Sequence, residues 1–99
     1  NNIEEILKVD GIDGTIIGPY DLSGSMGFPG EFEREDIKEA IQKVIKKCRE
    51  HNIPSGFHVV DTNPEKIKSK IDMGCTFLAY GIDYLFLRDS VMSGMKKLK

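Results

Sequence analysis

The sequence predicts an α/β fold in which short parallel strands alternate with helices. Three short apolar runs, near residues 15–17, 55–60 and 76–80, are bounded by glycine, proline or polar residues, as strands are. Apolar residues recur at offsets of three and four in the segments between them, which is typical of amphipathic helices. Strands that alternate with helices in this way favour a parallel sheet.

The first strand is predicted at Thr15–Ile17. A segment before it is typical of a helix end, with apolar residues on one face and a stop at Asp10-Gly11. The strand is β-branched, as expected of a parallel strand that is buried on both faces. Gly18-Pro19 ends it, so Asp21 follows just beyond its carboxyl end, the edge where parallel α/β folds hold ligands.

A glycine-rich segment then runs from Gly24 to Gly30. It lacks the G-x-x-x-x-G-K-[ST] pattern of a phosphate-binding P-loop. We interpret it as a loop at the active site.

A long amphipathic helix is predicted from Glu35 to about Asn52. Its charges complement the helix dipole, with acidic residues in the first turn and basic ones toward the end. His51, at its end, is expected to be a surface residue. Its apolar stripe is core packing and consists of Ile37, Ala40, Ile41, Val44, Ile45 and Cys48.

The remaining elements follow in the same order. A second strand is predicted at residues 55–60 and a helix after it, with Asn63 as N-cap and Gly74 as the glycine beyond its end. Ile67 and Ile71 should face inward from this helix. A third strand at about 76–80 and a short turn at 83–86 lead to a final helix. Its apolar residues, predicted to pack in the core or between subunits, are Val91, Met92, Met95 and Leu98.

Composition excludes two classes of partner. Fourteen basic residues against sixteen acidic ones give a formal net charge of −2, which offers no positive field to nucleic acid or an acidic membrane. No apolar run approaches the ~20 residues of a membrane span. Cys48 and Cys75 lack CxxC spacing, which favours reduced thiols. With no targeting segment, we expect a cytoplasmic protein.

Three ordered blocks resemble one known family. Residues 13–23 read Asp-Gly-Thr-Ile-Ile-Gly-Pro-Tyr-Asp-Leu-Ser, and residues 26–30 read Met-Gly-Phe-Pro-Gly. Together they look like the D-G-x-x-I-G-P-x-D-L-S and M-G-x-P-G signature of the HpcH/HpaI family of metal-dependent 2-oxo acid aldolases. Residues 54–57 resemble the family's next strand, and residues 74–83 resemble the G-x-x-F-V-A-V-G-x-D run of its last strand.

The resemblance implies a (β/α)8 TIM barrel, which needs ~250 residues. The chain has 99 residues. We therefore expect residues 1–99 to be the C-terminal fragment of a single aldolase-type barrel domain, covering its last three βα units. The family's other metal-binding carboxylate, its pyruvate-binding arginine and its histidine base would lie before Asn1, so no catalytic residue is predicted in this segment.

Asp21 corresponds in this resemblance to the family's metal-binding aspartate. Mg²⁺ and Mn²⁺ prefer carboxylate and water oxygens, and one or two protein carboxylates suffice when the substrate completes the shell. The metal would chelate the 2-oxo acid and act as a Lewis acid. The residues alone also allow Asp21 to cap the turn before Leu22-Ser23.

Gly18, Pro19 and Tyr20 are candidates for substrate binding. Glycine lets a ligand approach the backbone closely, and the adjacent amides can receive a pyruvate carboxylate. A turn that ends a strand also needs Gly and Pro without any substrate, so a purely structural interpretation stays open.

His58 is a further candidate for the substrate pocket. Strand alternation places Gly56, His58 and Val60 on one face and Phe57 with Val59 on the other. Family aldolases more often carry an aliphatic residue at the place that His58 occupies. The alternative is a structural histidine with a satisfied hydrogen bond.

The implied function is that of a lyase that reversibly cleaves a 4-hydroxy-2-oxo acid to pyruvate and an aldehyde. The segment by itself would be inactive. One alternative is a citrate-lyase-like or synthase member of the same superfamily, because a fold does not fix its substrate. Another is a non-catalytic fragment that serves as an assembly module. The resemblance implies a homo-oligomer, and unpaired sheet edges also favour association.

Overall fold

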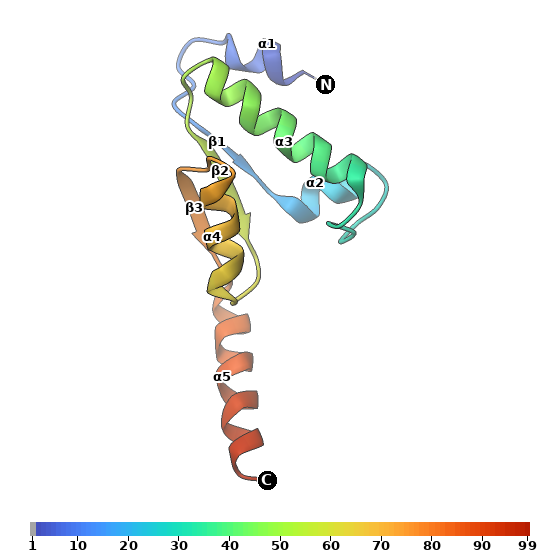
Figure 1. Cartoon of the computed structure of the whole chain (residues 1–99), viewed down its shortest axis with the longest axis vertical. Helices are drawn as coiled ribbons and strands as arrows, with labels where there is room; N and C mark the ends of the chain where they lie inside the picture. The colour runs from blue at the N-terminus through green and yellow to red at the C-terminus, as the bar shows by residue number, and fades with distance from the viewer. Residues whose placement is uncertain (1) are drawn as a thin grey trace.

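The computed structural model describes residues 2–99 and contains one three-stranded parallel sheet. The strands pair in the order β1-β2-β3, with β1 at Thr15–Ile17, β2 at Ser55–Val59 and β3 at Phe77–Tyr80. The helices are α1 (Ile3–Leu7), α2 (Pro19–Ser25), α3 (Glu35–Glu50), α4 (Pro64–Asp72) and α5 (Asp83–Lys97). The predicted α/β order of parallel strands and helices is confirmed (Figure 1).

The core lies on one face of the sheet. Ile17 is opposite Phe57 in the strand register, and Phe57 is opposite Leu78, so the three form a row across the sheet. The apolar stripe of α3 covers this row with its buried residues Ile37, Ile41, Ile45 and Cys48. Removing apolar area from water, at about 25 cal/mol per Å², holds α3 on the sheet.

The opposite face of the sheet is bare. Ile16 and Phe77 flank Gly56 in the register there, and they are 51% and 55% exposed. The prediction that the first strand is buried on both faces is therefore wrong for the described residues, because helices cover only one face. A methyl group at Gly56 would lie 2.7 Å from the Thr15 carbonyl oxygen and 2.8 Å from that of Phe77. This strand spacing requires glycine at that position.

Helix α2 is an element that the sequence analysis did not predict. Gly18 precedes it in extended conformation, and Pro19 occupies its first position, where an N–H would have no helical partner. The loop expected from residue 24 consequently begins after Ser25. Asp21 lies in the first turn of this helix and does not cap an isolated turn.

Helix α4 begins and ends as predicted. The side chain of Asn63 accepts a hydrogen bond from the backbone N–H of Glu65 at 3.0 Å. Gly74, beyond the helix, has a φ of +104°, a conformation that glycine adopts without strain. The two flanking strands differ by one residue from the prediction, since β2 ends at Val59 and β3 begins at Phe77.

One predicted inward position on α4 is wrong. Ile67 packs against the core, whereas Ile71 is 53% exposed. The half-buried residues Lys70 and Met73 mark the inner face of α4. Ile71 lies about 100° around the helix from Lys70, so it points away from the sheet.

Helix α5 extends away from the rest of the chain (Figure 1). It begins at Asp83, so residues 83–86 are its first turn and not the separate turn that was predicted. None of its residues is buried, and Val91, Met92 and Met95 are each more than half exposed. The core-packing interpretation of these side chains is therefore wrong within residues 2–99, because no other element lies alongside them.

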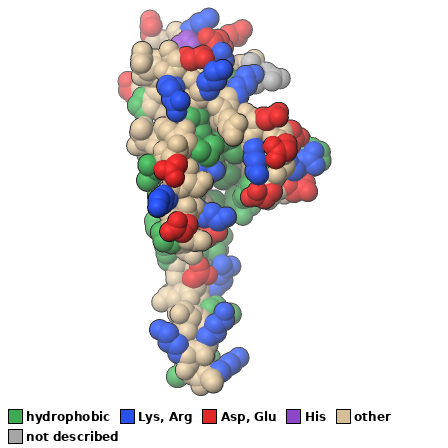
Figure 2. Space-filling model, in the orientation of Figure 1, with side chains coloured by type: hydrophobic (Ala, Val, Ile, Leu, Met, Phe, Trp, Pro, Cys, Tyr) green, Lys and Arg blue, Asp and Glu red, His purple; other side chains and the backbone are tan. Residues whose placement is uncertain are grey.

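The surface carries charges of both signs. Figure 2 shows acidic and basic side chains interspersed over the body, with basic ones along the projecting helix. Lys96 and Lys97 belong to the last turn of α5. Within the described residues no helix has both the length and the apolar character needed to cross a membrane. Cys48 and Cys75 are both free, as predicted, and both are buried.

Candidate functional site

The carboxyl ends of the three parallel strands lie at one edge of the sheet. Residues 18–21, 60–63 and 81–83 emerge there. The candidates Gly18, Pro19, Tyr20 and Asp21 all belong to the first of these segments, and His58 is the penultimate residue of β2. The structure therefore brings the predicted residues to the edge at which parallel α/β folds bind ligands.

The carboxylate of Asp21 turns back over the end of β1. A methyl group at Gly18 would lie 3.0 Å from Oδ2 of Asp21, so the missing side chain at Gly18 leaves room for this carboxylate. Asp21 is exposed, and within residues 2–99 its side chain forms no ion pair. Its oxygens are therefore free to bind a cation.

The described residues around Asp21 do not form a complete metal site. Within the described residues no group of three or more His, Cys, Asp or Glu side chains is placed to hold a metal ion. A single carboxylate nevertheless fits a hard divalent cation, because Mg²⁺ sites in proteins often use one or two carboxylates, with water and substrate completing the shell. The donor set agrees with a shared site to which this chain contributes in part.

The loop after α2 is fixed by a fully buried hydroxyl. Oγ of Ser23 donates to the carbonyl of Tyr20 at 3.2 Å and accepts from the N–H of Gly30 at 3.0 Å. The Tyr20 ring packs edge-on against Phe32, with 4.9 Å between ring centroids. These contacts hold the loop against the helix that carries Asp21.

His58 lies on the face that strand alternation predicted. Phe57 and Val59 belong to the core, whereas His58 is half-buried. Its Nε2 is 2.9 Å from the carbonyl oxygen of Gly81. Because a carbonyl can only accept, Nε2 is the donor in this bond, and Nδ1 remains for other contacts. His58 thus links β2 to the segment that leads into α5.

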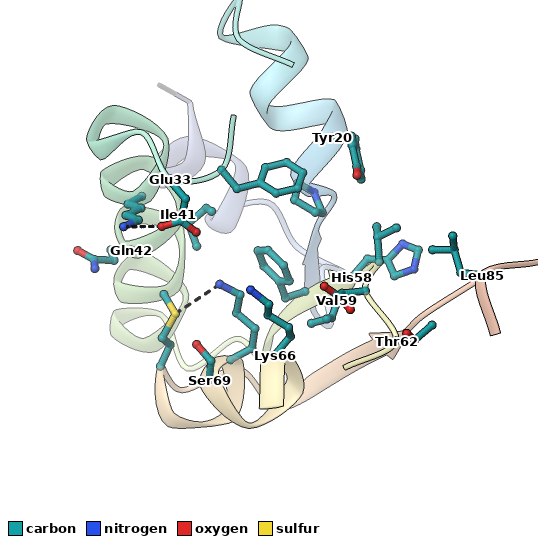
Figure 3. Close-up of a pocket in the computed structure, with 18 of the residues that line it drawn as sticks. Tyr20, Glu33, Ile41, Gln42, His58, Val59, Thr62, Lys66, Ser69 and Leu85 are labelled. Carbon is teal, nitrogen blue, oxygen red and sulfur yellow. Dashed lines mark hydrogen bonds and ion pairs between the residues drawn. The ribbon is translucent and has the colours of Figure 1, made fainter. Parts of the chain in front are cut away.

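A groove of about 640 Å³ begins at this edge and continues into the space between α3 and α4 (Figure 3). Pro19, Tyr20 and His58 line the groove. Gly18 and Asp21 do not line it. The candidate residues therefore share the same edge of the sheet, but the Asp21 carboxylate lies outside this groove.

A polar cluster at the ends of β2 and β3 was missed by the sequence analysis. The hydroxyl of Thr62 donates to Oδ2 of Asp89 at 2.5 Å, and the hydroxyl of Tyr80 donates to the carbonyl of Thr62. Thr62 and then Arg88 hold the pKa of Asp89 below its usual range. Asp61 and Thr62 directly follow a predicted strand, so their place at the carboxyl edge of the sheet could have been predicted from the sequence. Asp89 comes from α5, and no local pattern indicated its place.

Comparison with known proteins identifies the family. The sequence profile described as HpcH/HpaI aldolase/citrate lyase matches residues 1–90. The chain belongs to this family. The aldolase resemblance of the three sequence blocks is thereby confirmed.

Named members of the HpcH/HpaI family are similar over most of the chain. It is 39% identical over 82 residues to the 2-keto-3-deoxy-L-rhamnonate aldolase of Klebsiella pneumoniae, which covers 83% of the chain and 30% of that protein. It is 36% identical over 98 residues to the hydroxypyruvate/pyruvate aldolase of Roseobacter denitrificans, which covers 99% of the chain and 38% of that protein. The chain thus spans about a third of the length of these relatives.

A solved HpcH/HpaI structure shows to which fold the three strands belong. The chain matches a family protein from Burkholderia cenocepacia with a TM-score of 0.91 at 20% identity, over 97% of the chain and 37% of that protein. The fold is that of βα units of a TIM barrel, as the resemblance implied. Because the helices of such a barrel lie outside, the bare face with Ile16 and Phe77 is the inner face.

Proposed function

We propose that the intact protein containing this chain is a divalent-metal-dependent aldolase and that Asp21 is one of its metal ligands. It would reversibly cleave a 4-hydroxy-2-oxo acid to pyruvate and an aldehyde. The free Asp21 carboxylate above Gly18, at the carboxyl end of β1, is the observation that carries the proposal. The names of the relatives, a keto-deoxy-sugar-acid aldolase and a pyruvate aldolase, support the same class of reaction.

Each candidate residue has a role in this proposal. Asp21 binds Mg²⁺ or Mn²⁺ through a carboxylate oxygen, together with a carboxylate from outside residues 1–99. The cation supplies Lewis-acid activation of the 2-oxo acid. Gly18 lets the substrate approach the backbone, the backbone N–H of Tyr20 donates to the substrate carboxylate, and Pro19, which has no N–H, contacts the substrate without a hydrogen bond. His58 contacts the substrate from β2 through Nδ1, since Nε2 is bonded to Gly81.

Residues 1–99 are, in this proposal, one part of the active enzyme. Residues 1–99 form the C-terminal part of one barrel domain, and they do not catalyse the reaction alone because they hold one of the metal's carboxylates. The exposed apolar side chains of α5 support association of the intact protein into a homo-oligomer.

Steady-state kinetics of the intact protein test the role of Asp21. Asp21→Asn keeps the shape of the side chain and removes its charge. It should lower kcat/KM for Mn²⁺-dependent pyruvate release by more than about a hundredfold, because losing even an outer-shell partner of a metal ligand costs 10–100-fold.

Asp13→Asn is the matched control. Asp13 is also an exposed aspartate and lies just before β1, and its change should leave kcat/KM within about twofold. Full activity of Asp21→Asn would remove Asp21 from the site. A metal-dependent reaction without pyruvate release would instead place the protein with the synthase or citrate-lyase-like members.

A further inference from the structure

Charged side chains gather where the groove runs between α3 and α4. Glu33 and Lys38 form an ion pair at 3.0 Å. Lys66 and Lys70 also line the groove, and within residues 2–99 neither forms an ion pair. Lys38 foremost, with Lys66 and Lys70, holds the pKa of Glu33 low, as expected for groups that lie near one another. Three ammonium groups thus lie near the Glu33 carboxylate, and Asp61, Arg88 and Asp89 also line the groove.

Lys70 is half-buried, whereas Lys66 is exposed. Its Nζ lies 4.5 Å from the centroid of the Phe57 ring and 3.8 Å from Sδ of Met73. Burial is the main cause that lowers the pKa of the Lys70 amino group, and the charge on Lys66 adds to it. An aromatic face and a thioether are weak partners for an ammonium group. Among the described residues Lys70 therefore has only weak partners on this side of the groove.

The walls beside the lysines are apolar. Ile41 of α3, Phe57 of β2 and Met73 at the end of α4 line this part of the groove, and the polar side chains of Gln42 and Ser69 lie at its rim. A volume of about 640 Å³ is within the range of small-molecule sites, which combine apolar walls with a few polar groups. The cavity therefore suits a ligand with one charged end and one apolar end.

We propose that the groove between α3 and α4 binds an amphipathic anion, a phosphate or carboxylate joined to an aromatic or aliphatic group. Lys66 and Lys70, one turn apart on α4, bind the charged end. The apolar end lies against Ile41 and Met73. Pro19, Tyr20 and His58 line the other end of the same groove, but Lys66 and Lys70 have no role in the proposed aldolase reaction, and Asp21 does not line the groove.

Isothermal titration calorimetry of the intact protein tests the proposal, with phenyl phosphate as the probe. The buffer contains EDTA, so that the phosphate cannot bind a metal ion. Lys66→Gln and Lys70→Gln should each weaken binding by about tenfold, the effect of losing one charged hydrogen bond. Lys70→Arg keeps the charge and should retain most of the affinity.

Lys68→Gln is the matched control, because Lys68 lies on the same helix but does not line the groove. It should change the affinity by less than about twofold. Benzyl alcohol, without the charge, and inorganic phosphate, without the apolar group, should each bind more weakly than phenyl phosphate. Circular dichroism of each variant confirms that it folds.

Three results would overturn the proposal: no binding of phenyl phosphate at millimolar concentration, an equal loss in Lys68→Gln, or equally tight binding of benzyl alcohol. Asp21→Asn should bind the probe normally even where it loses aldolase activity. The two proposals can therefore fail separately.

Discussion

Helices α3 and α5 are similar in length, 16 and 15 residues, but differ in what covers their apolar side chains. Helix α3 buries Ile37, Ile41, Ile45 and Cys48 against the sheet. Helix α5 buries no residue within the described structure. Spacing of apolar residues thus indicates that a helix has a partner, but it does not indicate whether that partner belongs to the same chain.

The apolar residues of α5 follow helical spacing along one face. Tyr84, Leu87 and Val91, and Leu98 directly after the helix, are 55–81% exposed, and they are separated by three, four and seven residues. Exposed apolar patches of this kind mark interaction sites. We expect the face to be covered by a second copy of the protein, in line with the proposed homo-oligomer.

The largest loss of stability is expected from a substitution in the sheet against which α3 packs. Gly56→Ala would place a methyl group 2.7–2.8 Å from carbonyl oxygens of both neighbouring strands. The strands would have to separate, so urea unfolding of the intact protein should show a loss of more than about 4 kcal/mol. At Gly24 an added methyl group meets nothing within 4 Å. Gly24→Ala should therefore have an unchanged or slightly raised stability, and equal losses in the two variants would contradict the account.

Smaller losses of stability should distinguish α3 from α5. Ile41→Ala removes a buried side chain of α3 and should lower the free energy of unfolding by about 2–5 kcal/mol at every protein concentration. Met95→Ala, in exposed α5, should cost less than about 0.5 kcal/mol in the dissociated protein and more where the protein associates. Urea titrations at several concentrations measure both. A concentration-independent loss of several kcal/mol in Met95→Ala would show that α5 packs within its own chain.

The smallest effect concerns α1, which α3 holds by ion pairs. Glu4 lies 2.9 Å from Nε2 of His51 and 3.2 Å from Nζ of Lys47. The His51 hydrogen bond, and then that of Lys47, holds the pKa of Glu4 below its ordinary value of 4.5. A carboxyl group whose pKa is lower in the folded state stabilises the fold at pH values above its ordinary pKa. This stabilisation is lost as the pH falls through the folded-state pKa.

Acid titration should therefore loosen α1 below about pH 4.5. The methyl NMR signals of buried Leu7 report this change in the intact protein. Glu4→Gln should abolish the transition, whereas Glu5→Gln, at the exposed neighbouring position, should retain it. An unchanged transition in Glu4→Gln would assign the acid sensitivity to another group.

Elements whose signals lie within their own residues were predicted correctly. β1 follows from its β-branched run, α3 from its stripe, and the start of α4 from the Asn63 cap. Helix α2 was missed because glycine and serine, poor helix formers, make up its second half. Its end is fixed by the bond from Gly30 to Ser23, a contact outside the helix that its own residues do not reveal.

In the candidate site, too, some features could be predicted from local sequence and others could not. The place of Asp21 follows from the strand end before it, and the face of His58 follows from strand alternation, so both could be predicted. The hydrogen bond from His58 to Gly81 and the lysine-lined groove depend on how separate elements pack. No local pattern in the sequence carries that information.

The central claim, that Asp21 is a metal ligand, is tested most directly by Mn²⁺ binding to the intact protein, followed by electron paramagnetic resonance. Asp21→Asn should weaken Mn²⁺ binding by at least about tenfold, and the control Asp13→Asn should bind as the unchanged protein does. Equal Mn²⁺ affinity in Asp21→Asn and the unchanged protein would contradict the claim.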